Sequence, residues 1–184
     1  MMDARADEMA MGVEAERLKR RAATAAVVVA AILIAIKVWA WTATHSVAML
    51  ASLIDSSLDL LASSLNLLAV RHALTPADRE HRFGHGKAEA LAGLGQAAFI
   101  ALSATFLLYE SMMRLIDPRP VEQGTIGLVV IGISMALTVA LVLYQRYVIS
   151  RTRSLAIVAD HLHYVTDIAT NLGVVLALVL AGVW

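Results

Sequence analysis

Three aspartates and a histidine lie where the sequence is otherwise strongly apolar. Asp55 and Asp59 are four residues apart in one apolar run, and His163 and Asp167 have the same spacing in another. Residues four apart share one face of a helix. Ionisable groups inside a bilayer are costly and by default indicate function. Three carboxylates and one imidazole suit a tetrahedral divalent ion, and zinc fits first because it accepts nitrogen and oxygen donors in that geometry.

The two pairs are predicted to lie at the same depth. Asp55 follows Ser46 by nine residues and His163 follows Ser154 by nine, which corresponds to roughly 14 Å along each helix. Because the hydrocarbon core is about 30 Å thick, both pairs fall near its middle. Pairing among these groups, or with Lys37, would explain a single aspartate. It explains two matched pairs poorly, so a metal site is favoured.

Such a site predicts competition between metal and protons. Three carboxylates packed together without a cation cannot all stay ionised, so some should take up protons when no metal is bound. A divalent ion would displace these protons and that of His163. Competition for one site is the chemical basis for exchange transport.

A second group of metal-binding residue types lies in a short polar segment. Asp78, His81 and His85 are close together in the sequence. Two imidazoles and a carboxylate can bind zinc and leave a fourth position open or filled by water. The spacing fits a basic loop with solvent-facing histidines equally well, so both interpretations stand at this point.

Composition places these groups in a membrane protein. The chain has 184 residues, of which 59% are hydrophobic and only 16% are charged, and its mean hydropathy is +0.72. These values are too apolar for a soluble domain of this size. Because the sequence contains no cysteine, disulfides and thiolate chemistry are excluded.

Five apolar stretches each provide the roughly 20 residues that a bilayer-crossing helix requires. We therefore expect an all-α integral membrane protein with a transmembrane domain over residues 22–184. Residues 1–21 form a polar N-terminal segment, which we expect to be a solvated tail rather than a surface helix. The predicted spans cover residues 22–44, 46–70, 88–113, 123–146 and 154–184.

Basic residues are unevenly divided between the two sides of these spans. Of the 15 lysines and arginines, the two loops opposite the N-terminus hold only Arg114 and Arg119. Cytoplasmic loops are enriched in such residues, so the bias predicts a cytoplasmic N-terminus. The run Asp117-Pro118-Arg119-Pro120 predicts a break between the third and fourth spans. The residues on the N-terminal side are Arg5, Arg17, Lys19, Arg20, Arg21, Arg71, Arg79, Arg82, Lys87, Arg146, Arg151 and Arg153.

Other polar residues are interpreted from position alone. Lys37 lies inside the first span, where it would either snorkel or pair with an aspartate. His45 and His72 lie at span ends, where an interfacial position is expected. For Asp160 and His161 we favour a place where the helix leaves the membrane over a path from the cytoplasm.

Three runs in this order resemble the cation diffusion facilitator family. They are Leu53-Ile-Asp55-Ser-Ser-Leu-Asp59, His81-Arg-Phe-Gly-His85-Gly-Lys87-Ala-Glu89 and Asp160-His-Leu-His163-Tyr-Val-Thr-Asp167. The resemblance extends from about residue 20 to residue 184. It is closest to the bacterial zinc and iron exporters, which implies a protein of the bacterial inner membrane.

The resemblance implies a homodimeric exporter that moves zinc out of the cytoplasm in exchange for protons. Cadmium, iron and cobalt are also compatible with the donors, and no organic cofactor or nucleic acid is expected. On the family pattern the transport site comprises Asp55, Asp59, His163 and Asp167. A second, cytoplasmic zinc site of some bacterial members comprises Asp78, His81 and His85. Lys87 matches a position that forms a salt bridge near the dimer interface.

Members of the family usually add a sixth span and a cytoplasmic domain with a ferredoxin-like fold. The present sequence stops at Trp184, so we expect it to be a truncated form or the ordered part of a longer protein. Two other functions remain as alternatives, a channel for metal or protons and an intramembrane metalloenzyme. The enzyme is disfavoured because no His-Glu-x-x-His motif is present.

Overall fold

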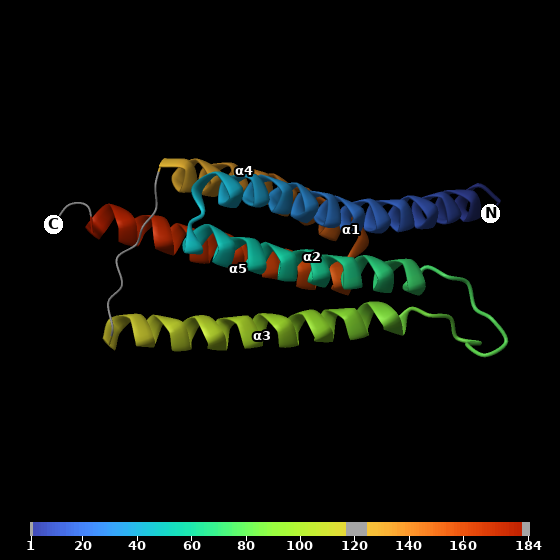
Figure 1. Ribbon diagram of the computed structural model, residues 1–184. Helices are drawn as coiled ribbons and strands as arrows, with labels where there is room; N and C mark the ends of the chain where they lie inside the picture. The colour runs from blue at the N-terminus through green and yellow to red at the C-terminus, as the bar shows by residue number, and fades with distance from the viewer. Residues whose placement is uncertain (1, 117–124, 182–184) are drawn as a thin grey trace.

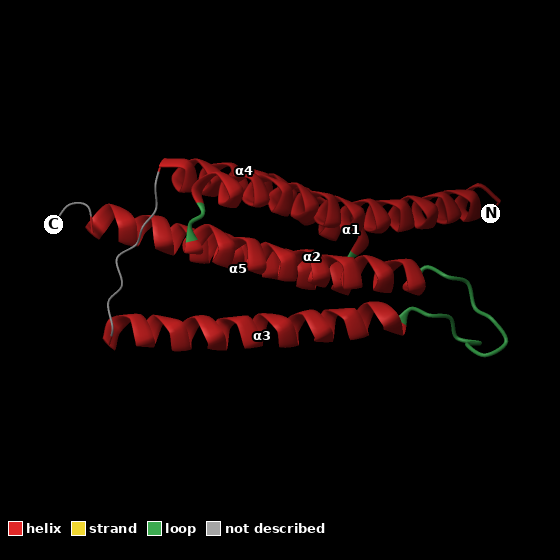
Figure 2. Cartoon of the chain, in the orientation of Figure 1, coloured by secondary structure: helices red, strands yellow, loops and turns green. Residues whose placement is uncertain are grey.

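The structure, a computed structural model, describes residues 2–116 and 125–181. Over these ranges the chain forms helices joined by turns and contains no strand, which confirms the predicted all-α class (Figure 2). The helices are α1 (Met2–Thr44), α2 (Val47–Ala73), α3 (Lys87–Ile116), α4 (Thr125–Thr152) and α5 (Leu155–Ala181).

Helix α1 differs from the expected solvated tail, because it begins at Met2 and continues without interruption to Thr44. Its N-terminal part extends beyond the end of α2 (Figure 1). Alanine, arginine, glutamate and methionine dominate this stretch and favour helix, and no proline interrupts it. Most side chains over residues 10–21 are exposed or only partly buried, so the segment is a solvated helical extension of the first span.

Within the part of the chain that the structure describes, four helices are long and apolar enough to cross a membrane, namely over Ala10–Thr44, Val47–Ala73, Lys87–Tyr109 and Ile126–Thr152. The fifth helix, α5, has 27 residues, and its predicted crossing stays a prediction. The predicted break at Asp117-Pro118-Arg119-Pro120 lies outside the described residues. So do the first two residues of the fourth predicted span and the last three of the fifth.

The five helices close into a ring. Helix α1 packs against α2 and α4, helix α3 packs against α2 and α5, and α4 completes the ring by packing against α5. Helices α2 and α5 also touch each other across the ring, and Figure 1 shows them running side by side. The two helices that carry the predicted metal ligands are therefore brought together in the interior.

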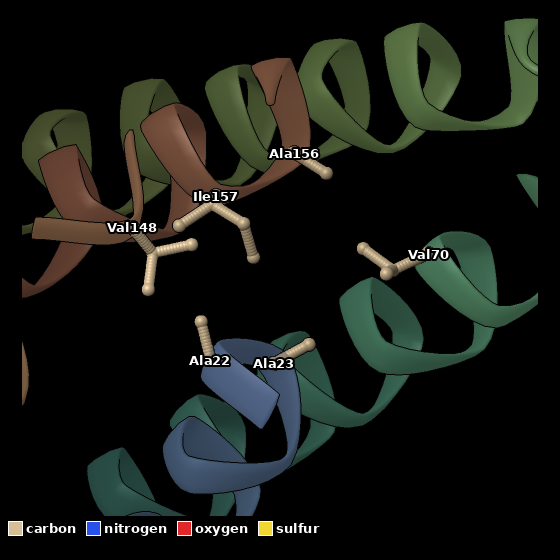
Figure 3. Close-up of a cluster of buried hydrophobic side chains, with 6 residues drawn as sticks. All are labelled: Ala22, Ala23, Val70, Val148, Ala156 and Ile157. Atoms are coloured by element: carbon tan, nitrogen blue, oxygen red, sulfur yellow. The ribbon is translucent and has the colours of Figure 1, made fainter. Parts of the chain in front are cut away.

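Small residues allow this close packing. One buried cluster joins four helices through Ala22, Ala23, Val70, Val148, Ala156 and Ile157 (Figure 3). Where α3 meets α5, Gly93 lies near the backbone of Leu155. A Cβ atom added to Gly93 would lie 3.7 Å from the carbonyl oxygen of Leu155, which is an ordinary van der Waals contact. Small residues at helix interfaces are typical of membrane bundles, where backbone approach supplies the van der Waals contact.

Two tight connections set the register of the helix pairs. His45 has a φ of 50° and its N–H bonds to the carbonyl of Trp41 at 2.7 Å, which ends α1. Arg153 also has a φ of 50° and ends α4 by bonding to Ile149 at 2.9 Å. Ser154 then accepts a hydrogen bond from the N–H of Ile157 at 3.4 Å and caps α5. Such short links make α2 antiparallel to α1 and α5 antiparallel to α4.

Candidate metal sites

A buried cluster forms where α2 and α5 meet. Asp59 comes from α2, and His163 and Asp167 come from successive turns of α5. The Nε2 atom of His163 lies 3.1 Å from Asp59 Oδ1 and 3.5 Å from Asp167 Oδ2. One ligand atom from each residue lies within 4.8 Å of the others. The structure thus brings together three of the four residues that the sequence pairs predicted.

The chemistry of this cluster fits a divalent cation. The His163 side chain is only 5% exposed, and the Asp59 side chain 13%. Asp167 Oδ2 is buried and has no hydrogen-bond partner among the described residues. Buried polar atoms are normally paired, so an orphaned carboxylate oxygen beside an imidazole nitrogen is suited to a metal.

Asp55 lies one turn before Asp59 on α2, but the structure does not bring it into the three-residue cluster. Its side chain is among the exposed ones of α2. The i, i+4 spacing correctly indicated a shared side of the helix, yet a shared side does not ensure that both carboxylates turn inward. Its role as a fourth ligand stays a prediction.

Lys37 lies close to this cluster, on α1, and is almost fully buried. Its ammonium group donates to the hydroxyl of Ser56 at 2.6 Å and to the backbone carbonyl of Ser52 at 3.1 Å. Both acceptors belong to the turns of α2 around Asp55 and Asp59. Of the two roles expected from the sequence, a direct ion pair with an aspartate is not formed among the described residues, and snorkelling stays a prediction. Instead, Lys37 is bound to the helix that carries the carboxylates.

Asp160, for which the sequence suggested a place where α5 leaves the membrane, lies inside the helix bundle, and its depth in the membrane stays a prediction. It is fully buried and accepts hydrogen bonds from Gln145 at 2.7 Å and, at the longer distance of 3.5 Å, from Ser63. The Ser63 hydroxyl also bonds to the hydroxyl of Tyr164 at 2.8 Å. This network joins α2, α4 and α5 one turn away from His163. Buried carboxylates require such partners, and Gln145 and Ser63 provide them.

Aromatic rings border the imidazole of His163. The ring of Phe99, from α3, meets it edge-on with centroids 5.6 Å apart, and the ring of Tyr164 lies 5.4 Å away. Sequence reasoning did not single out either residue, because their roles depend on which helices are neighbours. The helical spacing of Asp160, His163, Tyr164 and Asp167 could have indicated one functional face of α5.

The second predicted group assembles in the loop between α2 and α3. Asp78 Oδ1 accepts backbone hydrogen bonds from His81 at 2.6 Å and Glu80 at 2.9 Å. Gly84 has a φ of 75°, which glycine adopts without strain. The loop turns there, and the rings of His81 and His85 lie 4.5 Å apart. Ligand atoms from Asp78, His81 and His85 lie within 4.8 Å of one another.

The loop carboxylate is available to a cation. Hydrogen bonds to its oxygens, above all from the backbone of His81, lower the pKa of Asp78 below its usual value. A lowered pKa stabilises the turn at neutral pH, and this contribution is lost as the pH falls through the lowered value. His85 is 7% exposed, and its Nδ1 atom is buried without a hydrogen-bond partner in the described part of the chain. Both features fit a metal ligand set.

Beside this loop, Glu89 ties three helices together at one end of the bundle. It receives hydrogen bonds from Lys19 of α1, at 3.2 Å, and from the hydroxyl of Ser154 at the start of α5. Lys87 begins α3 and is exposed. Its place in an interface salt bridge stays a prediction.

A ring of long apolar helices around buried carboxylates and an imidazole is the architecture of a multi-spanning membrane protein. Residues 23–184 match the family described as the cation efflux transmembrane domain. The chain therefore belongs to the cation efflux family.

Individual relatives carry the name cation-efflux pump FieF. The protein from Citrobacter koseri is 49% identical over 165 residues, which cover 90% of this chain and 55% of the relative. The protein from Shewanella oneidensis is 50% identical over 165 residues, covering 89% and 56%, and that from Klebsiella pneumoniae 48% over 162, covering 88% and 54%. The chain thus spans about half the length of the curated relatives it matches.

Proposed function

We propose that this protein exports a divalent transition metal, zinc first, from the cytoplasm in exchange for protons. The observation that carries the proposal is the cluster of Asp59, His163 and Asp167 between α2 and α5. The donor atoms of this cluster suit zinc. The chain that contains it belongs to a family of cation efflux proteins. Cadmium, iron and cobalt remain compatible substrates, since donor type narrows the choice without closing it.

The exchange follows from the chemistry of the cluster. Metal ligands must be deprotonated, so an arriving cation releases protons from the carboxylates and from His163. When the metal leaves on the far side, the crowded carboxylates take up protons again. The ligands come from two helices, so a relative movement of α2 and α5 would open the site first to one side and then to the other.

The same proposal covers orientation, assembly and the loop. The N-terminus is cytoplasmic, as the distribution of basic residues predicts. This places the loop of Asp78, His81 and His85 in the cytoplasm, where it binds a second zinc ion. The working protein is a homodimer of the inner membrane, with Lys87 near the interface.

Flux measurements on the full-length protein in proteoliposomes test the exchange. A carrier should give zinc uptake that saturates with concentration and an opposite movement of protons, followed with a dye that reports the internal pH. Zinc uptake that stays linear with concentration, with no proton movement, would instead support the channel.

Metal selectivity tests the donor set. His163→Asp makes the cluster all-oxygen, which should weaken the preference for zinc and admit manganese better, because hard oxygen ligands suit manganese. Competition between the two metals in the transport assay measures this preference. Phe99→Leu is the control, because it alters an aromatic neighbour of His163 but no donor atom. If the His163→Asp protein retains the wild-type ratio, the imidazole is not a ligand.

Lys37 offers a test based on charge. Its ammonium group is bound within one turn of Asp55 on α2, so it should repel an arriving cation. At an assumed separation of roughly 10 Å and an effective dielectric constant of 20, repulsion between one unit charge and a divalent ion amounts to about 3 kcal/mol. Lys37→Gln is therefore expected to bind zinc on the order of a hundredfold more tightly by calorimetry, whereas Lys37→Arg should match the wild type. Weaker binding by the glutamine variant would mean that Lys37 shapes the site instead.

A further inference from the structure

The loop between α2 and α3 lies against a third imidazole that the family motif does not include. His72 lies in the last turn of α2. Its ring centroid is 4.4 Å from that of His85, in an edge-on arrangement. The ring centroid of His81 lies 4.5 Å from that of His85. His85 is therefore flanked by two further imidazoles, one from the loop and one from the helix.

We propose that His72 is the fourth ligand of a closed metal site formed with Asp78, His81 and His85. The inference rests on the loop metal site of the proposed function and adds to it. Three nitrogen donors and one carboxylate oxygen complete a tetrahedral zinc site, whereas three protein ligands leave a position for water. The site is then structural rather than open to exchange with solvent.

Three of the four ligands are already gathered, whereas His72 lies outside that group and has to turn its ring toward it. Ligand atoms of Asp78, His81 and His85 already lie within 4.8 Å of one another. Tetrahedral zinc with ligands at about 2.1 Å would bring them to roughly 3.4 Å apart. The His72 side chain is exposed, so rotation about its side-chain bonds toward His85 meets little steric resistance.

The unpaired nitrogen of His85 is the second observation. Its side chain is 7% exposed, yet Nδ1 has no hydrogen-bond partner among the described residues. The other nitrogen, Nε2, lies 3.6 Å from Asp78 Oδ2, which is too long for a hydrogen bond. A buried imidazole nitrogen without a partner is costly, and binding a cation would remove that cost.

A position at the C-terminus of a helix has a simpler explanation, which is favourable interaction of a cationic side chain with the helix dipole. Arg71 and His72 are both basic residues of the last turn of α2. An effect of this kind stabilises the helix and leaves the metal site unchanged. As a ligand, by contrast, His72 joins the end of α2 directly to the loop, and α2 carries Asp59.

The test measures zinc affinity and the visible spectrum of bound cobalt in the full-length protein in detergent. Asp59→Ala serves as the background, so that the loop site is observed alone. His72→Asn should lower zinc affinity at least about tenfold, because losing a ligand costs no less than losing a residue that supports one. The cobalt bands of a four-ligand tetrahedral site should change in position and intensity. His45→Asn, an exposed histidine where another span ends, is the matched control and should change neither.

The outcomes separate this inference from the proposed function. Unchanged affinity and spectrum in His72→Asn, with binding lost in His85→Ala, would leave a three-ligand loop site and overturn the role of His72. Binding unchanged in both variants would overturn the loop site itself, and the inference with it. A loss of helix content without a change in the cobalt spectrum would assign His72 to the helix dipole alone.

Discussion

Asp59→Ala is expected to abolish metal transport by the full-length protein. Asp59 is the one carboxylate of α2 that the structure brings to the cluster, and its Oδ1 lies 3.1 Å from His163 Nε2. Without it the remaining members of the three-residue cluster come from α5 alone, so the cluster would no longer link α2 to α5 through a cation. Zinc uptake into proteoliposomes, together with equilibrium zinc binding, measures the loss.

Ser57→Ala is the matched control. Ser57 lies on the same stretch of α2, but its side chain is exposed and its hydroxyl bonds to the backbone carbonyl of Leu53 at 2.8 Å. Transport should be unchanged in this variant. Asp55→Ala then tests the predicted fourth ligand. If Asp59→Ala transports zinc at the wild-type rate, the central cluster is not the transport site.

The sequence was most informative where a residue type conflicts with its surroundings. Aspartates and a histidine in apolar runs are costly unless they serve a purpose, and their i, i+4 spacing places each pair on one face. The matching depths of the two pairs in the membrane then follow from their equal distance, in residues, from the starts of the two antiparallel helices. For this reason the meeting of Asp59, His163 and Asp167 is predictable from the sequence alone.

Side-chain partners across helices could not be predicted in this way. Asp160 carries the same sequence signal as Asp167, yet it pairs with Gln145 and Ser63. Asp160 differs from Asp167 because α4 and α2 are the neighbours of that part of α5. The order of the helices in the ring cannot be predicted from the sequence of one helix. Likewise His72 is 13 residues from His85 in the sequence, and only the turn of the intervening loop brings their rings together.

For the N-terminal segment before the first span, the sequence indicated solvent exposure but not the backbone conformation. Its charged composition indicated exposure, which the structure bears out for most side chains over residues 10–21. Exposure does not decide between coil and helix, however. A helix already formed in the first span extends at little cost into residues of high helix propensity, because the nucleation step has been completed.

The network around Asp160 leads to a stability prediction. Gln145→Leu removes the donor at 2.7 Å from a fully buried carboxylate and leaves it with Ser63 at 3.5 Å. Loss of a hydrogen bond to a buried, ionisable group costs on the order of 2–3 kcal/mol. We expect the free energy of unfolding, measured by denaturant titration in mixed micelles, to fall by about this amount.

A second substitution distinguishes the lost hydrogen bond from lost packing. In the Asp160→Leu/Gln145→Leu protein neither buried polar group remains unpaired, and apolar replacement of both partners is often neutral or stabilising. Ser63 and Tyr164 still satisfy each other through their bond of 2.8 Å. The double variant should therefore recover most of the stability lost in Gln145→Leu. Additive losses in the cycle would show that Gln145 acts by filling space between α4 and α5, and that Asp160 is held in the bundle by other contacts.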